Sequence, residues 1–359
     1  MTSREFCRIA GRLMRRPAAP FHEHAVREEV ERLCREHGLA FRRDRFGNVL
    51  VRLHTARVRP LVLAAHMDHP GFEIVRRRGA ACRVRFQGGV GDSWFRPGLP
   101  LRLMPSGARA ALGPRVGKDK TFELIPRQPV DSADAFAVWE MEDFSVRNGR
   151  IHGRACDDLI GVAAILATLI ELKRKRARVN VIGVLSRAEE IGFRGALAVA
   201  DSGALPRTSL VISLETSREL PGVRMDSGVI LRVGDRALVF DPKAGRFLSE
   251  VALDLQRRNR SFQFQRALMS GGTCEGTVYQ EFGFQTAAVC VALGNYHNCA
   301  PRNRIAPEFV SVKDACGMVD LLVHAARCMP KYERMTSALP ARLRRLLRNA
   351  RRRLLTSAT

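Results

Sequence analysis

Apolar runs of strand length alternate with helical segments through most of this chain, and this alternation limits its fold more than any other feature. The apolar runs cover residues 48–53, 61–65, 179–186, 209–215 and 286–293. Helical spacing marks residues 1–40, 157–176, 193–203, 248–260 and 310–329. Strands that alternate with helices usually form a parallel sheet between two helical layers. We therefore predict an α/β fold with a mainly parallel sheet and helices on both faces.

A different composition interrupts the alternation between Gly71 and Asn148. Glycine and proline are frequent there, and short alternating runs replace helical periodicity. These runs cover residues 81–88, 99–107, 120–126 and 134–141. We predict a small all-β domain over 71–148, inserted into an α/β domain made of residues 1–70 and 149–332. A basic tail over 333–359 completes the predicted organisation.

The composition is that of a globular protein in a reducing compartment. The chain has 359 residues, of which 46% are hydrophobic, enough for a large core. No apolar run reaches the roughly 20 residues of a membrane span, and the first residues lack the features of a secretory signal. The 9 cysteines have no paired spacing, and their odd number prevents complete pairing. We therefore expect reduced thiols and a cytoplasmic location.

The formal net charge of +24 comes mostly from arginines spread along the chain. Such an excess suits either an anionic partner or an arginine-rich solvated surface. We prefer the second and predict no specific nucleic-acid partner, because no nucleic-acid-binding motif occurs. In the segment 341–355, leucines recur at helical spacing among arginines. This tail could contact an anionic membrane, but we prefer a surface helix that is docked on its own domain or partly frayed.

Acidic and imidazole side chains gather where the predicted strands end and where one helix begins. The carboxyl ends of parallel strands meet at one edge of a sheet, and ligands bind beyond that edge. A single residue of this kind is usually a hydrogen-bonded loop residue or a helix cap, so the inference depends on the whole set. The set is His66, Asp68, Asp157, Asp158, Glu189, Glu190, Glu215 and His297.

The chemistry that this set fits is a pair of divalent metal ions. Imidazole and carboxylate groups are normal zinc ligands, and cobalt and manganese are alternatives. Two ions about 3.5–4 Å apart need a carboxylate that bridges them. The predicted ligands are His66 and Glu215 for one ion, His297 and Glu190 for the other, and Asp157 for the bridge.

Two further acids complete the predicted site as catalytic residues. Glu189 lies beside a ligand but is not needed as one, so we expect it to take a proton from water as the general base. Asp68 follows His66 by two residues and can orient that imidazole through a hydrogen bond.

Five segments occur in the same order in the dinuclear metallo-aminopeptidases of the glutamyl-aminopeptidase and TET type, within the zinc-exopeptidase clan. They are HMDHPGFEI, GRACDDLIGVAAIL, SRAEEIGFRGA, SGGTCEG and GNYHNCAPRN, and the resemblance extends over residues 20–330. It implies a zinc-exopeptidase-like fold and the ligands and base given above, with zinc as the expected metal. It also implies removal of N-terminal residues from peptides by a metal-activated water. Finally, it implies a homo-oligomer in which the inserted β domain serves dimerisation or acts as a lid.

Three departures from the family pattern bear on the site. Glu215 stands where the family usually has aspartate. Cys274 replaces an acid in the SGGT loop, and the neighbouring Glu275 is a candidate substitute for it. Arg302 and Arg304 follow the last histidine and could attract an acidic substrate group, although we prefer to interpret them as surface charges.

Two other functions stay open at this point. The clan also contains carboxypeptidases and N-acyl amino acid deacylases with similar ligands, and a requirement for a free α-amine separates these from an aminopeptidase. A protein that keeps the fold only for binding is the third hypothesis. Glu189 argues against it, because a binding protein needs no base beside a metal ligand, whereas Cys274 is in its favour.

Overall fold

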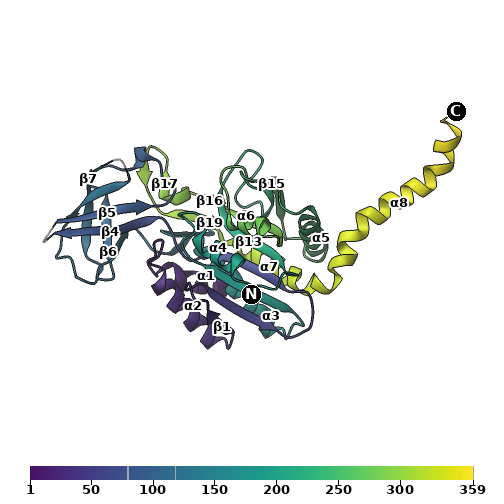
Figure 1. Ribbon diagram of the computed structural model, residues 1–359, viewed down its shortest axis with the longest axis horizontal. Helices are drawn as coiled ribbons and strands as arrows, with labels where there is room; N and C mark the ends of the chain where they lie inside the picture. Colours follow the sequence, from purple (N-terminus) through teal and green to yellow (C-terminus); the bar gives the residue numbers. More distant parts are fainter. Residues whose placement is uncertain (79–80, 118, 359) are drawn as a thin grey trace.

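A computed structural model describes residues 1–78, 81–117 and 119–358. Its centre is an 11-stranded sheet, and a closed barrel of further strands lies at one end (Figure 1). The strands of the sheet are Ala40–Arg43 (β1), Val49–His54 (β2), Leu61–His66 (β3), Ser145–Arg147 (β10), Arg150–Gly153 (β11), Asn180–Ser186 (β12), Leu210–Arg218 (β13), Val229–Gly234 (β14), Phe264–Leu268 (β15), Gln285–Gly294 (β16) and Glu308–Ser311 (β19). Their spatial order is β1-β2-β12-β3-β13-β16-β19-β11-β10, with β14 paired to β16 and β15 paired to β14.

The central strands of the sheet run parallel, whereas most outer pairings are antiparallel. β12, β3, β13 and β16 pair in parallel in that order. β1–β2, β2–β12, β14–β16, β16–β19, β19–β11 and β11–β10 are antiparallel pairs. The sheet is therefore mixed rather than mainly parallel as predicted. The short connections 44–48 and 148–149 explain two of these pairs, because a parallel pair needs a crossover of a dozen or more residues.

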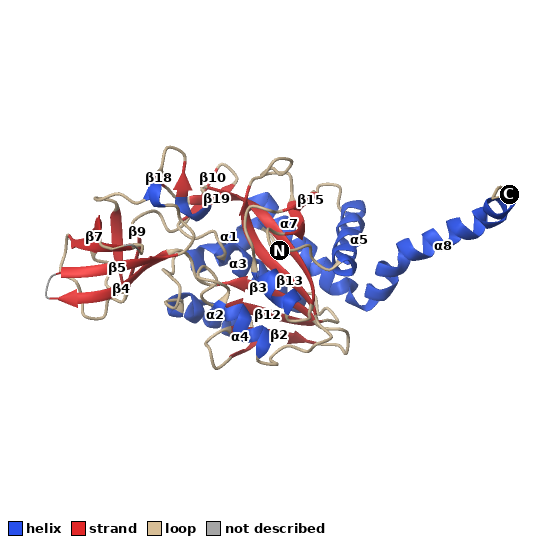
Figure 2. Cartoon of the chain, turned by 45° about the horizontal axis from the view of Figure 1, so that its top comes forward, coloured by secondary structure: helices blue, strands red, loops and turns tan. Residues whose placement is uncertain are grey.

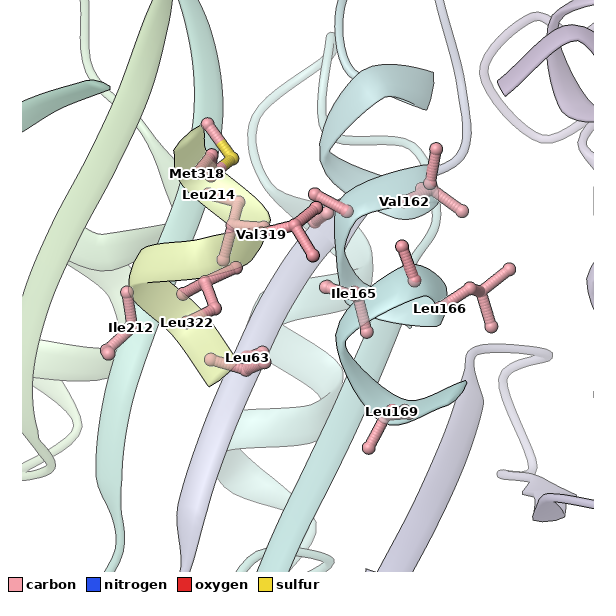
Figure 3. Packing of buried hydrophobic residues seen from close by; sticks show 14 of the residues in the cluster. Leu63, Val162, Ile165, Leu166, Leu169, Ile212, Leu214, Met318, Val319 and Leu322 are labelled. Atoms are coloured by element: carbon pink, nitrogen blue, oxygen red, sulfur yellow. The ribbon is translucent and has the colours of Figure 1, made fainter. Parts of the chain in front are cut away.

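The apolar side chains of β3 enter two separate clusters. Leu63 packs in a cluster that includes α3 (Leu159–Arg174) and α7 (Val312–Cys328), and Figure 3 shows it among their side chains. Val62 packs in a second cluster with α4 (Arg194–Asp201) and α6 (Glu275–Glu281). Successive residues of a strand point to opposite faces, so β3 is buried on both sides. This explains why its apolar run is unbroken.

The N-terminal segment forms two helices instead of the single helical region predicted over 1–40. They are α1 (Ser3–Met14) and α2 (His24–Glu36), and β1 begins soon afterwards. Pro17 and Pro20 lie between the helices. Proline has no backbone N–H and clashes with the preceding turn, so it ends a helix. Farther along the chain, α5 (Pro242–Arg258) begins earlier than predicted because Pro242 occupies its first turn and Asp241 accepts a hydrogen bond from the Ala244 N–H at 2.6 Å.

The closed barrel has the strand order β4-β5-β8-β7-β6-β9. Phe72, Phe86 and Trp139 pack edge-on or tilted in its core, within 6.0 Å between ring centroids. All its strands lie within the predicted all-β segment, although the domain boundaries themselves stay a prediction. The barrel strands are Gly71–Arg78 (β4), Ala81–Gln87 (β5), Pro100–Met104 (β6), Arg109–Arg115 (β7), Thr121–Pro126 (β8) and Phe136–Trp139 (β9). Short elements elsewhere are Asp92–Trp94 (η1), Tyr296–Asn298 (η2), Cys299–Ala300 (β17), Arg304–Ile305 (β18) and Met329–Lys331 (η3).

The chain ends in a long helix, α8 (Tyr332–Thr356), that projects away from the body of the molecule. Figures 1 and 2 show it leaving the end opposite the barrel and extending without a neighbouring element. Neither α8 nor any other helix of the described residues is both long enough and apolar enough to cross a membrane.

Candidate active site

The predicted metal ligands lie together at one edge of the sheet. His66 is the last residue of β3, and Glu215 lies within β13. Glu190 follows β12, and His297 lies in η2, just after β16. Because these four strands run parallel, their carboxyl ends meet at the same edge. Asp157 lies at the same edge, between β11 and the start of α3.

His66 faces three carboxylates across one half of the site. Its Nε2 lies 3.6 Å from Asp157 Oδ1 and 3.8 Å from Glu215 Oε1. Glu189 Oε2 is 4.0 Å from the same nitrogen. The other ring nitrogen, Nδ1, lies 3.1 Å from the backbone carbonyl of Asp68. With Nδ1 at that carbonyl, Nε2 is the ring nitrogen that faces the carboxylates.

His297 faces the other half of the site in the same way. Its Nε2 lies 3.5 Å from Asp157 Oδ2 and 3.3 Å from Glu190 Oε1. Its Nδ1 lies 3.0 Å from the Gly89 carbonyl, which comes from the loop after β5. Asp157 therefore points one oxygen at each histidine, which is the geometry of a bridging carboxylate.

Asp68 positions the loop that carries the two adjacent glutamates. Its carboxylate accepts hydrogen bonds from the backbone N–H groups of Glu189 at 3.0 Å and Glu190 at 3.1 Å. The same carboxylate lies 3.5 Å from His66 Nδ1, so its contact with the imidazole is longer than those with the amides. Asp68 thus fixes the catalytic loop at least as directly as it fixes the histidine.

Glu308 is a site residue that the sequence analysis missed. One of its carboxylate oxygens accepts the backbone N–H groups of Cys156 at 2.8 Å and Asp157 at 3.0 Å, and the other accepts that of His297 at 2.8 Å. Glu308, on strand β19, therefore links the backbone of two predicted ligands, Asp157 and His297. It follows no apolar strand, so the criterion that found the other acids could not find it.

The His69 ring contacts the Asp157 backbone and the Asn298 side chain next to the site. Its Nδ1 lies 2.7 Å from the Asp157 carbonyl, and its Nε2 lies 3.0 Å from Asn298 Oδ1. Asp158 instead caps α3, because its Oδ1 accepts the Gly161 N–H at 3.1 Å. Each of these side chains positions backbone next to a predicted ligand.

The clustering of buried charges shifts several pKa values. Burial alone would lower the pKa of His66, but Glu189 and Asp157 outweigh it and hold the pKa well above its ordinary value. Burial raises the pKa of Glu215 to about 8, and the charge of Asp157 adds to this. Burial would also raise the pKa of Asp157, yet the facing imidazoles of His297 and His66 hold it far below its ordinary value. The Asp157 carboxylate therefore stays ionised.

The residues present fit a pair of metal ions. Asp157 Oδ1 and Glu190 Oε1 are buried and have no hydrogen-bond donor among the described residues. Buried polar atoms normally have a partner, and each of these oxygens instead faces an imidazole nitrogen. Ligand atoms converge within 4.8 Å of one another in three overlapping groups, namely His66, Glu189 and Glu215; Asp157, Glu190 and His297; and Asp157, Asp158 and Glu215. Mixed imidazole and carboxylate donors suit zinc and other divalent ions.

Two arginines line the pocket above this edge. Arg232 is only 5% exposed, its Nη1 donates to Ser217 Oγ at 3.2 Å, and its Nε has no acceptor among the described residues. Arg218 is exposed and donates to the Gly271 carbonyl at 2.9 Å. Neither was singled out from the sequence, whereas Arg302 and Arg304, which were considered, are exposed and do not line the pocket.

The SGGT loop contributes no predicted ligand atom to the ligand groups found among the described residues. Cys274 is a buried free thiol, and burial raises its pKa to about 12. Glu275 lies behind the site, where its carboxylate accepts the Ser186 hydroxyl. It therefore does not replace the missing acid as a ligand.

The sequence around this site matches the model of a known protein family. The model of the M42 glutamyl aminopeptidase family matches residues 132–306. The resemblance to the M42 family is confirmed. The matched segment contains Asp157, Glu189, Glu190, Glu215 and His297, whereas His66 and Asp68 precede it.

Solved structures extend the M42 likeness to the fold of nearly the whole chain. A TET aminopeptidase from Thaumarchaeota archaeon SCGC AB-539-E09 has a TM-score of 0.77 at 17% identity, covering 92% of this chain and 99% of its own. The TET1 peptidase of Pyrococcus horikoshii, described as assembling into a tetrahedron or a large octahedral shell, has a TM-score of 0.73 at 21% identity, covering 90% and 99%. An aminopeptidase of Desulfurococcus kamchatkensis has a TM-score of 0.73 at 21% identity, covering 92% and 97%.

Proposed function

We propose that this protein is a metal-dependent aminopeptidase that removes N-terminal residues from peptides. The observation that carries the proposal is Asp157, which presents one carboxylate oxygen to each of two histidines. The match to the M42 glutamyl aminopeptidase family supports it, as does the likeness in fold to three archaeal aminopeptidases and peptidases.

Two divalent ions, zinc by preference, fit the ligands found here. His66 and Glu215 would hold one, His297 and Glu190 the other, and Asp157 both. When bound, such ions polarise a carbonyl and lower the pKa of water toward neutrality.

Glu189 is the proposed general base and proton carrier. Its side chain is nearly buried, and its Oε2 lies within the ligand group of His66. Burial raises the pKa of Glu189 well above its ordinary value, with Glu215 and Glu190 adding to the shift. A carboxylate with a raised pKa takes a proton from water more readily and can then pass it to the leaving amine. Asp68 holds this loop through its two amide contacts.

We also propose that the protein forms a homo-oligomer in the cytoplasm through its barrel. Two structures of TET1 peptidase support assembly, since one is described as a dodecamer in the asymmetric unit and the other as a tetrahedron or a large octahedral shell. Within this proposal, residues 71–148 act as a separate inserted domain.

The decisive experiment compares matched substrates on metal-controlled enzyme. Chelator-stripped protein receives zinc, cobalt or manganese and is assayed on aminoacyl-anilides and their N-acetylated forms. We expect cleavage of the free-amine substrates only, restored by metal. Asp157→Asn should lose activity and bind less metal by elemental analysis, whereas Asp201→Asn, on the exposed end of α4, should behave as wild type.

Two results would contradict the proposal. Cleavage of the acetylated substrates in preference to the free amines would indicate a deacylase. Full activity in metal-stripped Asp157→Asn protein would exclude the proposed site.

A further inference from the structure

Helix α8 has one apolar face and is otherwise covered by arginines. At roughly 100° per residue, all leucines of α8 except Leu355 fall within an arc of roughly 100°. These leucines are 45–59% exposed and comprise Leu339, Leu343, Leu346, Leu347 and Leu354. The remaining faces carry Arg342, Arg344, Arg345, Arg348, Arg351, Arg352 and Arg353. No acidic residue occurs after Glu333, so this part of the helix has charge of one sign only.

Only the first turns of α8 are bound to the body of the protein. Tyr332 donates its hydroxyl to Gln285 at 2.7 Å and packs against the Phe247 ring at 4.9 Å. Arg246 donates to the Thr336 carbonyl at 2.8 Å. That carbonyl is available because Pro340, four residues later, has no N–H with which to bond it.

Past these first turns the helix stands clear of the domain. Leu339 still lines a surface pocket with residues of β14 and α5. Among the described residues, none after Leu339 forms a hydrogen bond or ion pair with the body, and Figures 1 and 2 agree that the helix extends alone. Docking on its own domain, the interpretation preferred from the sequence, is therefore confined to the base of α8.

We propose that α8 from Leu339 to Leu355 lies on an anionic lipid surface as an interfacial helix. Its leucines would enter the boundary between headgroups and acyl chains, and its arginines would bind the acidic headgroups. Charge complementarity and an exposed apolar face together carry this assignment. It does not depend on the proposed peptidase activity.

Two other occupants of this surface explain the helix less well. A nucleic acid would satisfy the arginines through its phosphates but would leave the leucine stripe exposed. A second copy of α8 would cover the leucines, yet it would bring two arginine-rich helices together without one acid to offset them. Arg353 would also fall on the seam that continues from Leu339, Leu343 and Leu346 at heptad spacing.

The position of α8 leaves the rest of the molecule free in the bound state. The barrel lies at the opposite end of the molecule (Figure 1). The pocket at the sheet edge is lined by residues of the body and by none of α8. Membrane attachment through α8 would thus keep the catalytic site open to soluble peptides.

The test is flotation of the full-length protein with lipid vesicles. Vesicles of phosphatidylglycerol and phosphatidylcholine are compared with vesicles of phosphatidylcholine alone, at low and at high salt. We expect binding to the anionic vesicles only, weakened by salt. The triple variant Leu343→Ser, Leu346→Ser, Leu347→Ser should bind these vesicles at least about tenfold more weakly than the wild type, because it removes most of the apolar face.

The matched control changes exposed leucines of the body instead. Leu253→Ser with Leu268→Ser removes side chains that are 40% and 50% exposed, and it should float as wild type does. Both variants should keep the wild-type unfolding temperature and peptidase activity, because the substituted leucines lie outside the core and the pocket. Helicity by circular dichroism checks that α8 is still formed.

Several results would overturn the proposal. One is equal flotation of the triple variant and the wild type, and another is equal binding to neutral vesicles. Tight binding to duplex DNA that the leucine changes leave intact, together with no flotation, would identify a nucleic-acid helix. Loss of oligomer mass in the triple variant by sedimentation, together with no flotation, would identify a second copy as the occupant.

Discussion

The sheet edge and helix α8 both concentrate charge, but they hold it in opposite ways. At the sheet edge, acids and histidines of both signs are buried and face one another within 4.0 Å. Along α8 after Glu333, the charges are arginines alone, and they are exposed. Burial makes an unpaired charge costly, so the sheet edge requires partners, whereas solvent screens the arginines of α8.

The comparison shows where a charged residue is fixed and where it is free. Asp157 and His297 are each held through backbone contacts to Glu308, and the glutamate loop is held by Asp68. No such partner holds the arginines that end α8 among the residues described. A charged side chain that is held in place can take part in catalysis. A charged side chain that is free to move can bind a large surface of variable shape.

The largest effect should come from removing the proposed base. Glu189→Gln keeps the shape of the side chain but cannot take a proton, so kcat on aminoacyl-anilides should fall about 10²- to 10⁴-fold. Metal content by elemental analysis should change little. Glu281→Gln, at the exposed end of α6, is the matched control. If Glu189→Gln kept the wild-type kcat, Glu189 would not be the general base. The fixed charges at the sheet edge would then differ from the free charges of α8 in burial only.

Removing the buried anchor should have the next largest effect. Glu308→Gln keeps only one good acceptor oxygen for three backbone N–H groups. Metal affinity should fall about 10- to 100-fold, and the free energy of unfolding should fall by about 1–3 kcal/mol. Metal titration and thermal unfolding measure these losses.

The control for this anchor is Glu123→Gln, on the exposed side of β8, which should change neither quantity. If Glu308→Gln kept both its metal affinity and its stability, Asp157 and His297 would have to be fixed by other contacts.

Among the described residues, Arg232 is the one buried cation of the pocket that has no ion pair. A substrate carboxylate could complete its contacts, so Arg232→Leu should lower kcat/KM for a glutamyl-anilide relative to a leucyl-anilide by about tenfold, the size of one charged hydrogen bond. Arg218→Leu, exposed at the same pocket, should shift this ratio less because solvent screens its charge. If the ratio of kcat/KM for the two anilides were unchanged in both variants, neither guanidinium would bind the side chain of the substrate.

The smallest effect should come from the ion pair at the base of α8. Lys243 and Glu333 lie 2.7 Å apart but are 44% and 76% exposed. Exposed pairs contribute about 0.2–1 kcal/mol, so Lys243→Ala should lower the unfolding temperature by no more than a few degrees. A loss as large as that of Glu308→Gln would show that surface charge matters here as much as buried charge.

The sequence by itself located the metal-ligand candidates and most elements around them. The unbroken apolar runs at 61–65 and 179–186 predicted buried strands, and the acids after them stood out because turns seldom carry such residues. The helix that Asp157 precedes followed from periodicity, as did β5, β6, β8 and β9 between Gly71 and Asn148, whereas β4, β7 and β10 were not predicted. These features are local, so neighbouring residues suffice to predict them.

Only the tertiary structure decided how distant residues share the site. Glu308 lies on β19 and Arg232 on β14, and both reach the site because strands far apart in sequence pair with β16. The antiparallel pairs of β14 and β19 with β16 depend on the same long-range pairing. Sequence periodicity records which side of an element is buried, but not which other element buries it. For α8 after Leu339, no element among the described residues does so.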